Sequence, residues 1–518
     1  MTEAQARIGR AGVNVGYLLA QRARLNPDQT AVVDGATELD YARLNDEVNR
    51  LASGLAAEGI GAGDRVAILA SNSYRFYELL FACAKLGAIL VTVNYRLVAD
   101  EVEYVMRDSG AALLFHSAEF ADVAQTVARI VGDLRAGTLE GTQDGLSLQR
   151  LVENGTGEEP NRPVRLDAPL MILYTSGTTG HPKGAVLTHA NLVATSTNQH
   201  FDWGVTAADR CLVAAPLYHV GALLLLSWPT LHAGGTVVVH PGFDPRAVLD
   251  AIEHDRVSTL FLAPTMWRMM LLEPDALTRD LSAIRLCCSG GESLPLPLME
   301  QLIDVFGSQF TEGYGLTEAS AAVAVLRPEH LRTKSGSVGM PFLHVAVRVV
   351  APDGEDVPTG ALGEIIVNGP TVMAEYWGRP EATADKLRDG WLHTGDVGRF
   401  DADGFLFIVD RMDDMLISGG ENVYPAEVES VLHGHPDIDQ VAVIGVADER
   451  WGQIVTAAVV PADGASPTIE DIAAFCGDRL AGFKRPRRLV LVDDLPRNPS
   501  GKVLKRVLRD DLQAGAPR

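Results

Sequence analysis

The chain is poor in cysteine and in positive charge. Of its 518 residues only five are cysteines, and none has Cys-x-x-Cys spacing, so no disulfide framework is indicated and a reduced, cytoplasmic protein is expected. Lys and Arg together number 44 against 67 Asp and Glu, which gives a net charge of −23. Such an acidic chain repels polyanions, so neither nucleic acid nor an anionic membrane surface is expected as a partner.

A signal peptide and a membrane span are also missing from the pattern. Residues 1–16 contain no apolar signal core. The stretch from Leu212 to Val239 carries no Asp, Glu, Lys or Arg and is long enough to cross a bilayer. Pro216, Pro229 and Gly234 interrupt it, so we predict a buried strand, loop and helix here and no membrane span.

The most informative segment is 174–184, which reads Tyr-Thr-Ser-Gly-Thr-Thr-Gly-His-Pro-Lys-Gly. Glycines let backbone N–H groups approach an anion, hydroxyls add donors and Lys183 adds a point charge, which together suit a polyphosphate. A Walker A loop is excluded because Lys183 lies between Pro182 and Gly184. A flexible Ser/Gly-rich surface loop is the alternative. The candidate phosphate ligands are Thr175, Ser176, Gly177, Thr178, Thr179, Gly180 and Lys183.

This loop resembles the phosphate-binding signature of the adenylate-forming enzymes, which comprise acyl-CoA synthetases, peptide-synthetase adenylation domains and beetle luciferase. Taken singly, most of the other matching residues are ordinary turns or surface charges, but they follow the order of that family along the chain. The chain is most similar to the acyl-CoA synthetase branch. The further matches are Pro216–His219, Ser289–Glu292, Tyr314–Glu318, Thr394–Asp396, Asp410–Glu429 and Pro496–Lys502.

The fold class expected is α/β. Val66–Ala70, a helix capped by Asn72 or Ser73, and Ile89–Val93 form a strand–helix–strand unit typical of parallel sheets. The resemblance implies a large N-terminal domain of mixed sheets and helices over residues 1–410, a hinge at 411–413, and a small mobile α+β lid domain at 414–518. Within the lid we predict helices at 425–432 and 469–480 and strands at 441–446, 454–460 and 489–492.

The activity that the resemblance implies is attack of a carboxylate on the α-phosphate of ATP. Because two anions must meet, neutralisation and alignment of charge dominate such catalysis. The resemblance implies that Glu318 holds Mg²⁺, that Thr317 contacts the α-phosphate, and that Asp396 and Arg411 hold the ribose. The residues expected to line the adenine slot are Gly291, Glu292, Ser293, Glu312, Gly313, Tyr314 and Gly315.

The lid is expected to supply groups for two half-reactions. Lys502 is the candidate catalytic lysine, which would bridge substrate carboxylate and α-phosphate; the alternative is a solvated lysine in a frayed tail. Asp413 is the expected hinge residue. Rotation there would bring Gly419, Gly420 and Glu421 to the CoA arm. The basic cluster 484–488 either binds the nucleotide phosphates of CoA or is a solvated face.

The acid itself is less defined. His219 would lie between ATP and the acyl pocket, although by spacing alone it suits a core histidine equally well. Aliphatic residues follow it and no Asp is placed to anchor an ammonium group, so an acid without an α-amine is expected, with fatty acids favoured over aryl acids.

We therefore predict an ATP-, Mg²⁺- and CoA-dependent carboxylate–CoA ligase of lipid metabolism. The alternative is an enzyme that loads a carrier protein, although no fused carrier follows residue 518; a non-catalytic relative is disfavoured by Lys183, Glu318, Asp396 and Lys502. A homodimer is left open.

Overall fold

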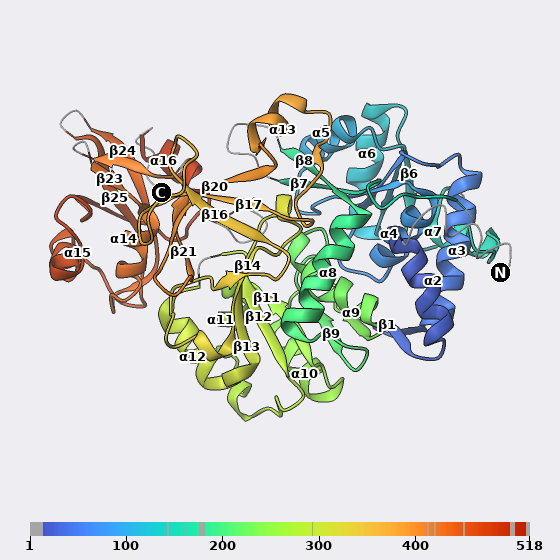
Figure 1. Cartoon of the computed structure of the whole chain (residues 1–518), viewed down its shortest axis with the longest axis horizontal. Coiled ribbons are helices and arrows are strands. Elements are labelled where there is room, and N and C mark those ends of the chain that lie inside the picture. The colour runs from blue at the N-terminus through green and yellow to red at the C-terminus, as the bar shows by residue number, and fades with distance from the viewer. Residues whose placement is uncertain are drawn as a thin grey trace.

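Two large sheets and a smaller one build the N-terminal three quarters of the molecule, and a separate small unit follows (Figure 1). The computed structural model describes residues 14–141, 145–160, 162–175, 182–292, 294–411, 414–418, 421–448, 451–497 and 503–513. The expected α/β class is confirmed, because parallel strands alternate with helices in both large sheets.

The first large sheet has seven strands, and its central strands are parallel. Strand β8 pairs antiparallel with β7 and with the edge strand β18, which comes from much later in the chain. In sheet order the strands are β18 (Glu375–Tyr376), β8 (Lys183–Thr188), β7 (Pro169–Thr175), β4 (Ile89–Thr92), β3 (Arg65–Leu69), β5 (Leu113–His116) and β6 (Arg135–Thr138).

The second large sheet has nine strands with a parallel centre. In sheet order they are β15 (Met340–Pro341), β14 (Ala324–Leu326), β13 (Phe310–Tyr314), β12 (Leu286–Gly290), β11 (Thr259–Leu262), β9 (Arg210–Val213), β10 (Thr236–Val239), β1 (Thr30–Asp34) and β2 (Thr37–Asp40). A five-stranded sheet contains β16 (Ala346–Val350), β17 (Gly363–Asn368), β20 (Trp391–Phe400), β19 (Leu387–Arg388) and β21 (Leu406–Arg411).

Helices cover these sheets and bury most of the apolar residues. One apolar cluster runs from α2 through both large sheets, and a second lies under the helices that follow β10. The helices are α2 (Val15–Leu25), α3 (Tyr41–Ala57), α4 (Arg75–Leu86), α5 (Ala99–Ser109), α6 (Ala121–Val131), α7 (Leu148–Asn154), α8 (His189–Trp203), α9 (Trp228–Ala233), α10 (Pro245–His254), α11 (Pro264–Leu271), α12 (Leu296–Phe306) and α13 (Pro380–Lys386).

The C-terminal unit has a sheet and an apolar core of its own. Figure 1 shows it in orange to red at one end of the molecule, and an ion pair joins Asp439 of this unit to Arg268 of α11. Its strands are β23 (Glu421–Val423), β22 (Leu416–Ser418), β25 (Gly452–Pro461), β24 (Ile438–Asp448) and β26 (Arg488–Leu491), and its helices are α14 (Pro425–Leu432), α15 (Ile469–Cys476) and α16 (Lys505–Gln513). Every predicted element is present, but the second helix ends at Cys476 and continues as a 3₁₀ turn, Gly477–Arg479.

The charge-free stretch is broken up as predicted. It forms the end of β9, a π-helix at Gly221–Ser227 (η2), α9 and β10, all largely buried. Within the described parts of the chain, no helix combines the length and the apolarity that a membrane crossing needs.

The strand–helix–strand prediction is confirmed by the parallel pairing of β3 with β4, but neither predicted cap residue, Asn72 or Ser73, is the N-cap. Helix α4 begins at Arg75 after Tyr74. The buried Asn72 side chain instead accepts a hydrogen bond from the Leu217 N–H (2.7 Å) and donates one to the Ala215 carbonyl (2.9 Å). The Asn72 side-chain amide, which the local sequence would assign to capping the helix, is thus used in a tertiary contact instead.

We predict that Asn72→Ala destabilises the protein by about 1–3 kcal/mol, because two buried backbone groups lose their partner. Ser73→Ala is the matched control. The Ser73 hydroxyl accepts a hydrogen bond of 3.3 Å from the Arg75 N–H at the start of α4, a contact within its own segment. Urea unfolding of both variants measures the difference. Equal shifts would contradict the clamp role of Asn72.

Candidate active site

The predicted phosphate loop connects β7 to β8 as a hairpin. Thr175 and Lys183 lie directly opposite each other in the antiparallel register, and the Thr175 hydroxyl lies 3.5 Å from the Lys183 carbonyl. The two described ends of the loop are therefore held together at the edge of the sheet. Five predicted ligands lie outside the described residues: Ser176, Gly177, Thr178, Thr179 and Gly180.

Glu318 lies in a short 3₁₀ turn, Thr317–Ala319 (η5), directly after Thr317. Ser320 and Ala321 follow with φ of 53° and 78°, in the left-handed region that residues with a Cβ rarely occupy. Backbone in such a conformation persists only where its surroundings hold it, and it is common at functional sites. Here the Ser320 hydroxyl donates to the Thr371 carbonyl at 2.7 Å, which fixes the turn.

Tyr376 on β18 brings Lys183 and Glu318 together, and sequence reasoning missed it. Its hydroxyl donates to Glu318 Oε1 at 2.7 Å, and the Lys183 ammonium lies over its ring, 5.5 Å from the centroid. A cation and a carboxylate from distant segments thus share one aromatic side chain. The notable signal in the sequence is an aromatic pair, Tyr376-Trp377, after a Pro/Gly turn, which is too common to single out.

The predicted adenine-slot residues lie at the carboxyl ends of β12 and β13. Ser289 and Gly290 pair with Glu312 and Gly313 in parallel register. Open α/β sheets bind ligands at this edge. Gly291, with φ of +85°, faces open space, because no atom lies within 4 Å of the place that a Cβ would occupy there. Glu292 follows it, and Ser293 lies outside the described residues.

Gly315, predicted to line the adenine slot, is also required by the packing of the backbone. A Cβ there would lie 1.8 Å from the Ala321 carbonyl oxygen, so this glycine is required by the chain that curls back after Glu318. The absence of a side chain at Gly315 therefore lets its backbone pack directly against the backbone of Ala321.

Burial dominates the electrostatics of Glu312. It raises the pKa of this carboxyl to about 8, and a hydrogen bond from the Leu294 backbone offsets only part of the effect. Glu312 is therefore mostly protonated at neutral pH, as a neutral donor and acceptor.

Asp396 is buried, and a tyrosine hydroxyl orients its carboxylate. It is buried on β20, and its Oδ2 accepts a hydrogen bond of 2.6 Å from the Tyr314 hydroxyl. The predicted adenine-slot residue Tyr314 and the predicted ribose residue Asp396 are thus brought into contact. Arg411 pairs with Asp396 in the backbone register of β20 and β21, but its side chain is not among the described parts.

His219 precedes the π-helix and differs from a satisfied core histidine. Desolvation by the surrounding protein lowers its pKa, yet its side chain is exposed. Gly221 starts the π-helix, and a Cβ there would lie 3.0 Å from the ring of Phe261. π-Helical turns are frequent at functional sites. The Asn72 clamp, which sequence reasoning assigned to a helix cap, fixes the segment just before His219.

Much of the predicted lid chemistry lies outside the described residues. This holds for Lys502, Asp413, Gly419 and Gly420, and only the backbone of Glu421 is described. Two members of the basic cluster serve the fold of the unit itself. Lys484 forms an ion pair with Glu427 at 2.6 Å, and the Arg485 guanidinium donates to the carbonyls of Leu480 and Gly477. That the cluster helps to bind the nucleotide phosphates of CoA stays a prediction.

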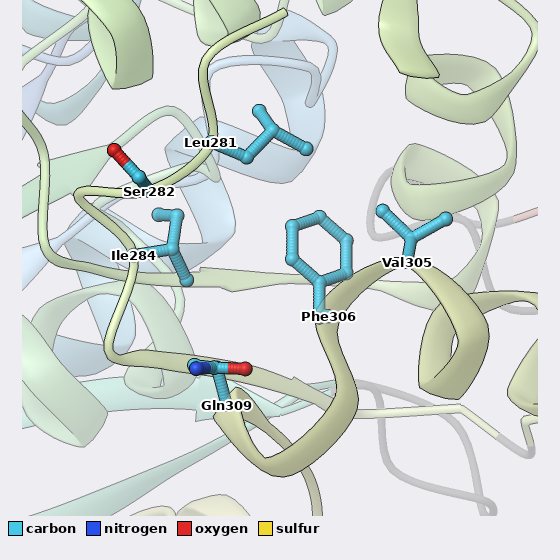
Figure 2. A pocket seen from close by; sticks show the side chains of 6 residues that line it. All are labelled: Leu281, Ser282, Ile284, Val305, Phe306 and Gln309. Atoms are coloured by element: carbon cyan, nitrogen blue, oxygen red, sulfur yellow. The ribbon is translucent and has the colours of Figure 1, made fainter. Parts of the chain in front are cut away.

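A hollow of about 290 Å³ lies elsewhere, at the amino ends of β12 and β13 (Figure 2). Ile284 precedes β12 and Gln309 precedes β13, so this hollow is at the edge of the sheet opposite to Gly290 and Tyr314. It is separate from the site described above.

Comparison with known proteins gives one consistent result. A family model described as AMP-binding enzyme matches residues 19–377, and one described as AMP-binding enzyme C-terminal domain matches residues 427–502. A feruloyl-CoA synthase of Amycolatopsis sp is 46% identical over 496 residues, which cover 96% of this chain and 98% of the relative.

Two further proteins extend the comparison. A long-chain-fatty-acid–CoA ligase of Mycobacterium tuberculosis is 38% identical over 510 residues, covering 98% of this chain and all of the relative. Among solved structures, o-succinylbenzoate coenzyme A synthetase from Bacillus subtilis in complex with ATP and magnesium superimposes with a TM-score of 0.85 and 33% identity, covering 95% of this chain and 99% of that one.

The raised pKa of Glu312 predicts how stability changes with pH. Because the native carboxyl keeps its proton to about pH 8 while the unfolded one ionises near 4.3, stability should fall as pH rises between these values. Glu312→Gln, which stays neutral, should show a smaller fall in urea unfolding from pH 5 to 8. The buried Glu78 has a similarly raised pKa and contributes equally to both proteins, so parallel curves would contradict the prediction.

Proposed function

The chain belongs to the AMP-binding enzyme family, and on that premise we propose that it is an AMP-forming carboxylate–CoA ligase. The first half-reaction would join a carboxylate to the α-phosphate of ATP and release pyrophosphate. In the second, the thiol of CoA would attack the acyl carbon and release AMP. Relatives named as CoA synthases and CoA ligases, which match over nearly the full length of this chain, support the proposal.

The observation that carries the proposal is the convergence of Lys183 and Glu318 on Tyr376. In a chain of net charge −23, a polyphosphate needs local positive charge, and the Lys183 ammonium supplies it next to the loop. Glu318 offers the hard oxygen ligand that Mg²⁺ takes together with phosphate oxygens.

The donor set fits a metal that arrives with its substrate. Across the described ranges, no group of three or more His, Cys, Asp or Glu residues is placed to hold a metal ion. A single carboxylate beside a phosphate loop is the arrangement expected for Mg²⁺ that keeps its other ligands from phosphate and water. When bound, the ion would neutralise charge on the β- and γ-phosphates.

The nucleoside would occupy the space between β12, β13 and β20. Asp396, oriented by the Tyr314 hydroxyl, would accept hydrogen bonds from the ribose. Gly291 leaves room beside the base, and the largely protonated Glu312 would present a neutral carboxyl there. Thr317, next to Glu318, would contact the α-phosphate.

The domain division follows from this chemistry. We propose residues 1–410 as the adenylating domain, 411–413 as a hinge with Asp413 at its centre, and 414–518 as a lid. Lys502 would enter for adenylation, and Gly419, Gly420 and Glu421 would replace it for thioester formation. The support is a C-terminal unit with an apolar core of its own, as a separately folded unit requires.

The acyl group would lie on the His219 side of the site. We expect its wall to be apolar, because buried leucines form the π-helix that follows His219, and Gly221 of that helix lies against the ring of Phe261. Such a wall suits an acid with an apolar body and no ammonium group. The comparisons support an aryl acid as much as the favoured fatty acid, since relatives named for ferulate and for long-chain fatty acids both match.

Pyrophosphate release across a panel of acids tests the function directly. We expect release with ATP and Mg²⁺ for either aryl-propenoic or fatty acids, and an acyl-CoA product when CoA is present. Acyl-AMP that persists despite CoA would indicate a carrier protein as acceptor. No release with any acid would contradict the proposal.

Lys502→Ala tests the lid separately. Because a lysine ammonium would stabilise charge at the α-phosphate only during adenylation, the variant should lose at least about 100-fold in pyrophosphate release. Conversion of preformed acyl-AMP and CoA to thioester should stay within about threefold of wild type. An equal loss in both assays would remove Lys502 from this role.

A further inference from the structure

A short strap, residues 370–377, links the two halves of the phosphate site. On one side the Met373 N–H donates to the Glu318 carbonyl at 2.8 Å. On the other the Ala374 and Trp377 N–H groups donate to the carbonyls of Val186 and Gly184, on the strand that leaves the phosphate loop. The strap thus fixes the distance between the turn that carries Glu318 and strand β8.

Side chains of α8 and α13 form further hydrogen bonds with the backbone of the strap. The Asn191 side chain donates to the carbonyls of Pro370 and Val372, both at 2.8 Å, and the Tyr376 N–H donates to the Thr383 hydroxyl at 2.9 Å. With its backbone held at both ends, the strap leaves Tyr376 little freedom to move.

Tyr376 projects from this strap into the site and is only 4% exposed. Its hydroxyl donates to Glu318 Oε1, and its ring face lies under the Lys183 ammonium. We infer that Tyr376 is a positioning residue for ATP activation, which aims Glu318 at the metal and holds Lys183 at the phosphates. The inference rests on the proposed function and adds a residue to it.

The hydroxyl can act only as a donor to Glu318. An ionised carboxylate has acceptors only, so the phenol must supply the proton of this 2.7 Å hydrogen bond. With Oε1 occupied by this bond, the carboxylate is turned in a set direction and Oε2 remains for a metal. Hydrogen bonds to ligating carboxylates commonly orient them in this way.

The ring acts on Lys183 by a different interaction. A cation over an aromatic face within about 6 Å is attracted by the ring quadrupole. Because hydroxyl and ring belong to one rigid side chain, the lysine and the carboxylate are held at one spacing.

The test separates the two contacts by substitution. Tyr376→Phe keeps the ring and loses the hydroxyl, whereas Tyr376→Leu loses both. Calorimetry would measure binding of a non-hydrolysable ATP analogue, first in EDTA and then over a Mg²⁺ series. This readout does not depend on the acid or on turnover.

For Tyr376→Phe we expect unchanged affinity in EDTA and about a 10-fold higher Mg²⁺ concentration at half-maximal enhancement, because the carboxylate loses its orienting donor. For Tyr376→Leu we expect the same Mg²⁺ effect together with about 2–5-fold weaker binding in EDTA, from loss of the cation–π contact. Unchanged Mg²⁺ dependence in Tyr376→Phe would overturn the inference.

Two controls exclude a general loss of structure. Tyr41→Phe removes an equally buried hydroxyl, which donates to the carbonyls of Leu231 and Gly235 away from the site, and it should leave both binding measurements as in wild type. In a double-mutant cycle, Tyr376→Phe should have no further effect on Mg²⁺ dependence once Glu318→Gln is present. Additive effects would show that Tyr376 acts on folding rather than through Glu318.

The outcome also distinguishes this inference from the proposed function. If wild type bound the ATP analogue with no Mg²⁺ enhancement, the ligase proposal itself would fail. If wild type showed the enhancement and Tyr376→Phe retained it unchanged, only the role of Tyr376 would be lost.

Discussion

The candidate site depends on the antiparallel pairing of β18 with β8. This pairing lays residues 370–377 along the strand that leaves the phosphate loop, while the same segment holds the turn of Glu318. Without it, a lysine and a carboxylate far apart in sequence would have no common support. Backbone hydrogen bonds, which leave little freedom, set their spacing more strictly than side-chain contacts alone can.

Charge explains why the site is built from such local devices. The protein as a whole repels polyanions, so the proposed binding of ATP and CoA would have to rely on a few cations and backbone donors placed where the phosphates lie. Among the basic residues near the C-terminus, Lys484 forms an ion pair with Glu427, and Arg485 donates to a backbone carbonyl of its own unit. Position, more than the number of cations, decides which of them can bind an anion.

Burial is the second requirement of the site, and it has a cost. Glu312 and Asp396 are both buried, which is unfavourable for a carboxyl group. At Glu312 the result is a raised pKa, whereas Asp396 gains a hydrogen bond from the Tyr314 hydroxyl. The left-handed residues after Glu318 carry a further cost in backbone strain. Stability lost in this way is typical of binding sites and is offset by the extensive apolar core beneath.

Local patterns in the chain were enough to predict the α/β class, the strand–helix–strand units and the buried charge-free segment, and the composition of the 174–184 loop singled out Lys183. Glu318 and Asp396 became candidate site residues only through the resemblance of the motif order to the adenylate-forming enzymes. Those inferences rest on periodicity and on motif order, which are properties of neighbouring residues. Three other features became visible only in the folded chain: Asn72 clamps the segment before His219, Gly315 makes room for a carbonyl, and Tyr376 joins lysine to carboxylate. Each of these is a contact between segments that are apart in sequence, and an asparagine, a glycine or a tyrosine has too many local uses for its partner to be read from its neighbours.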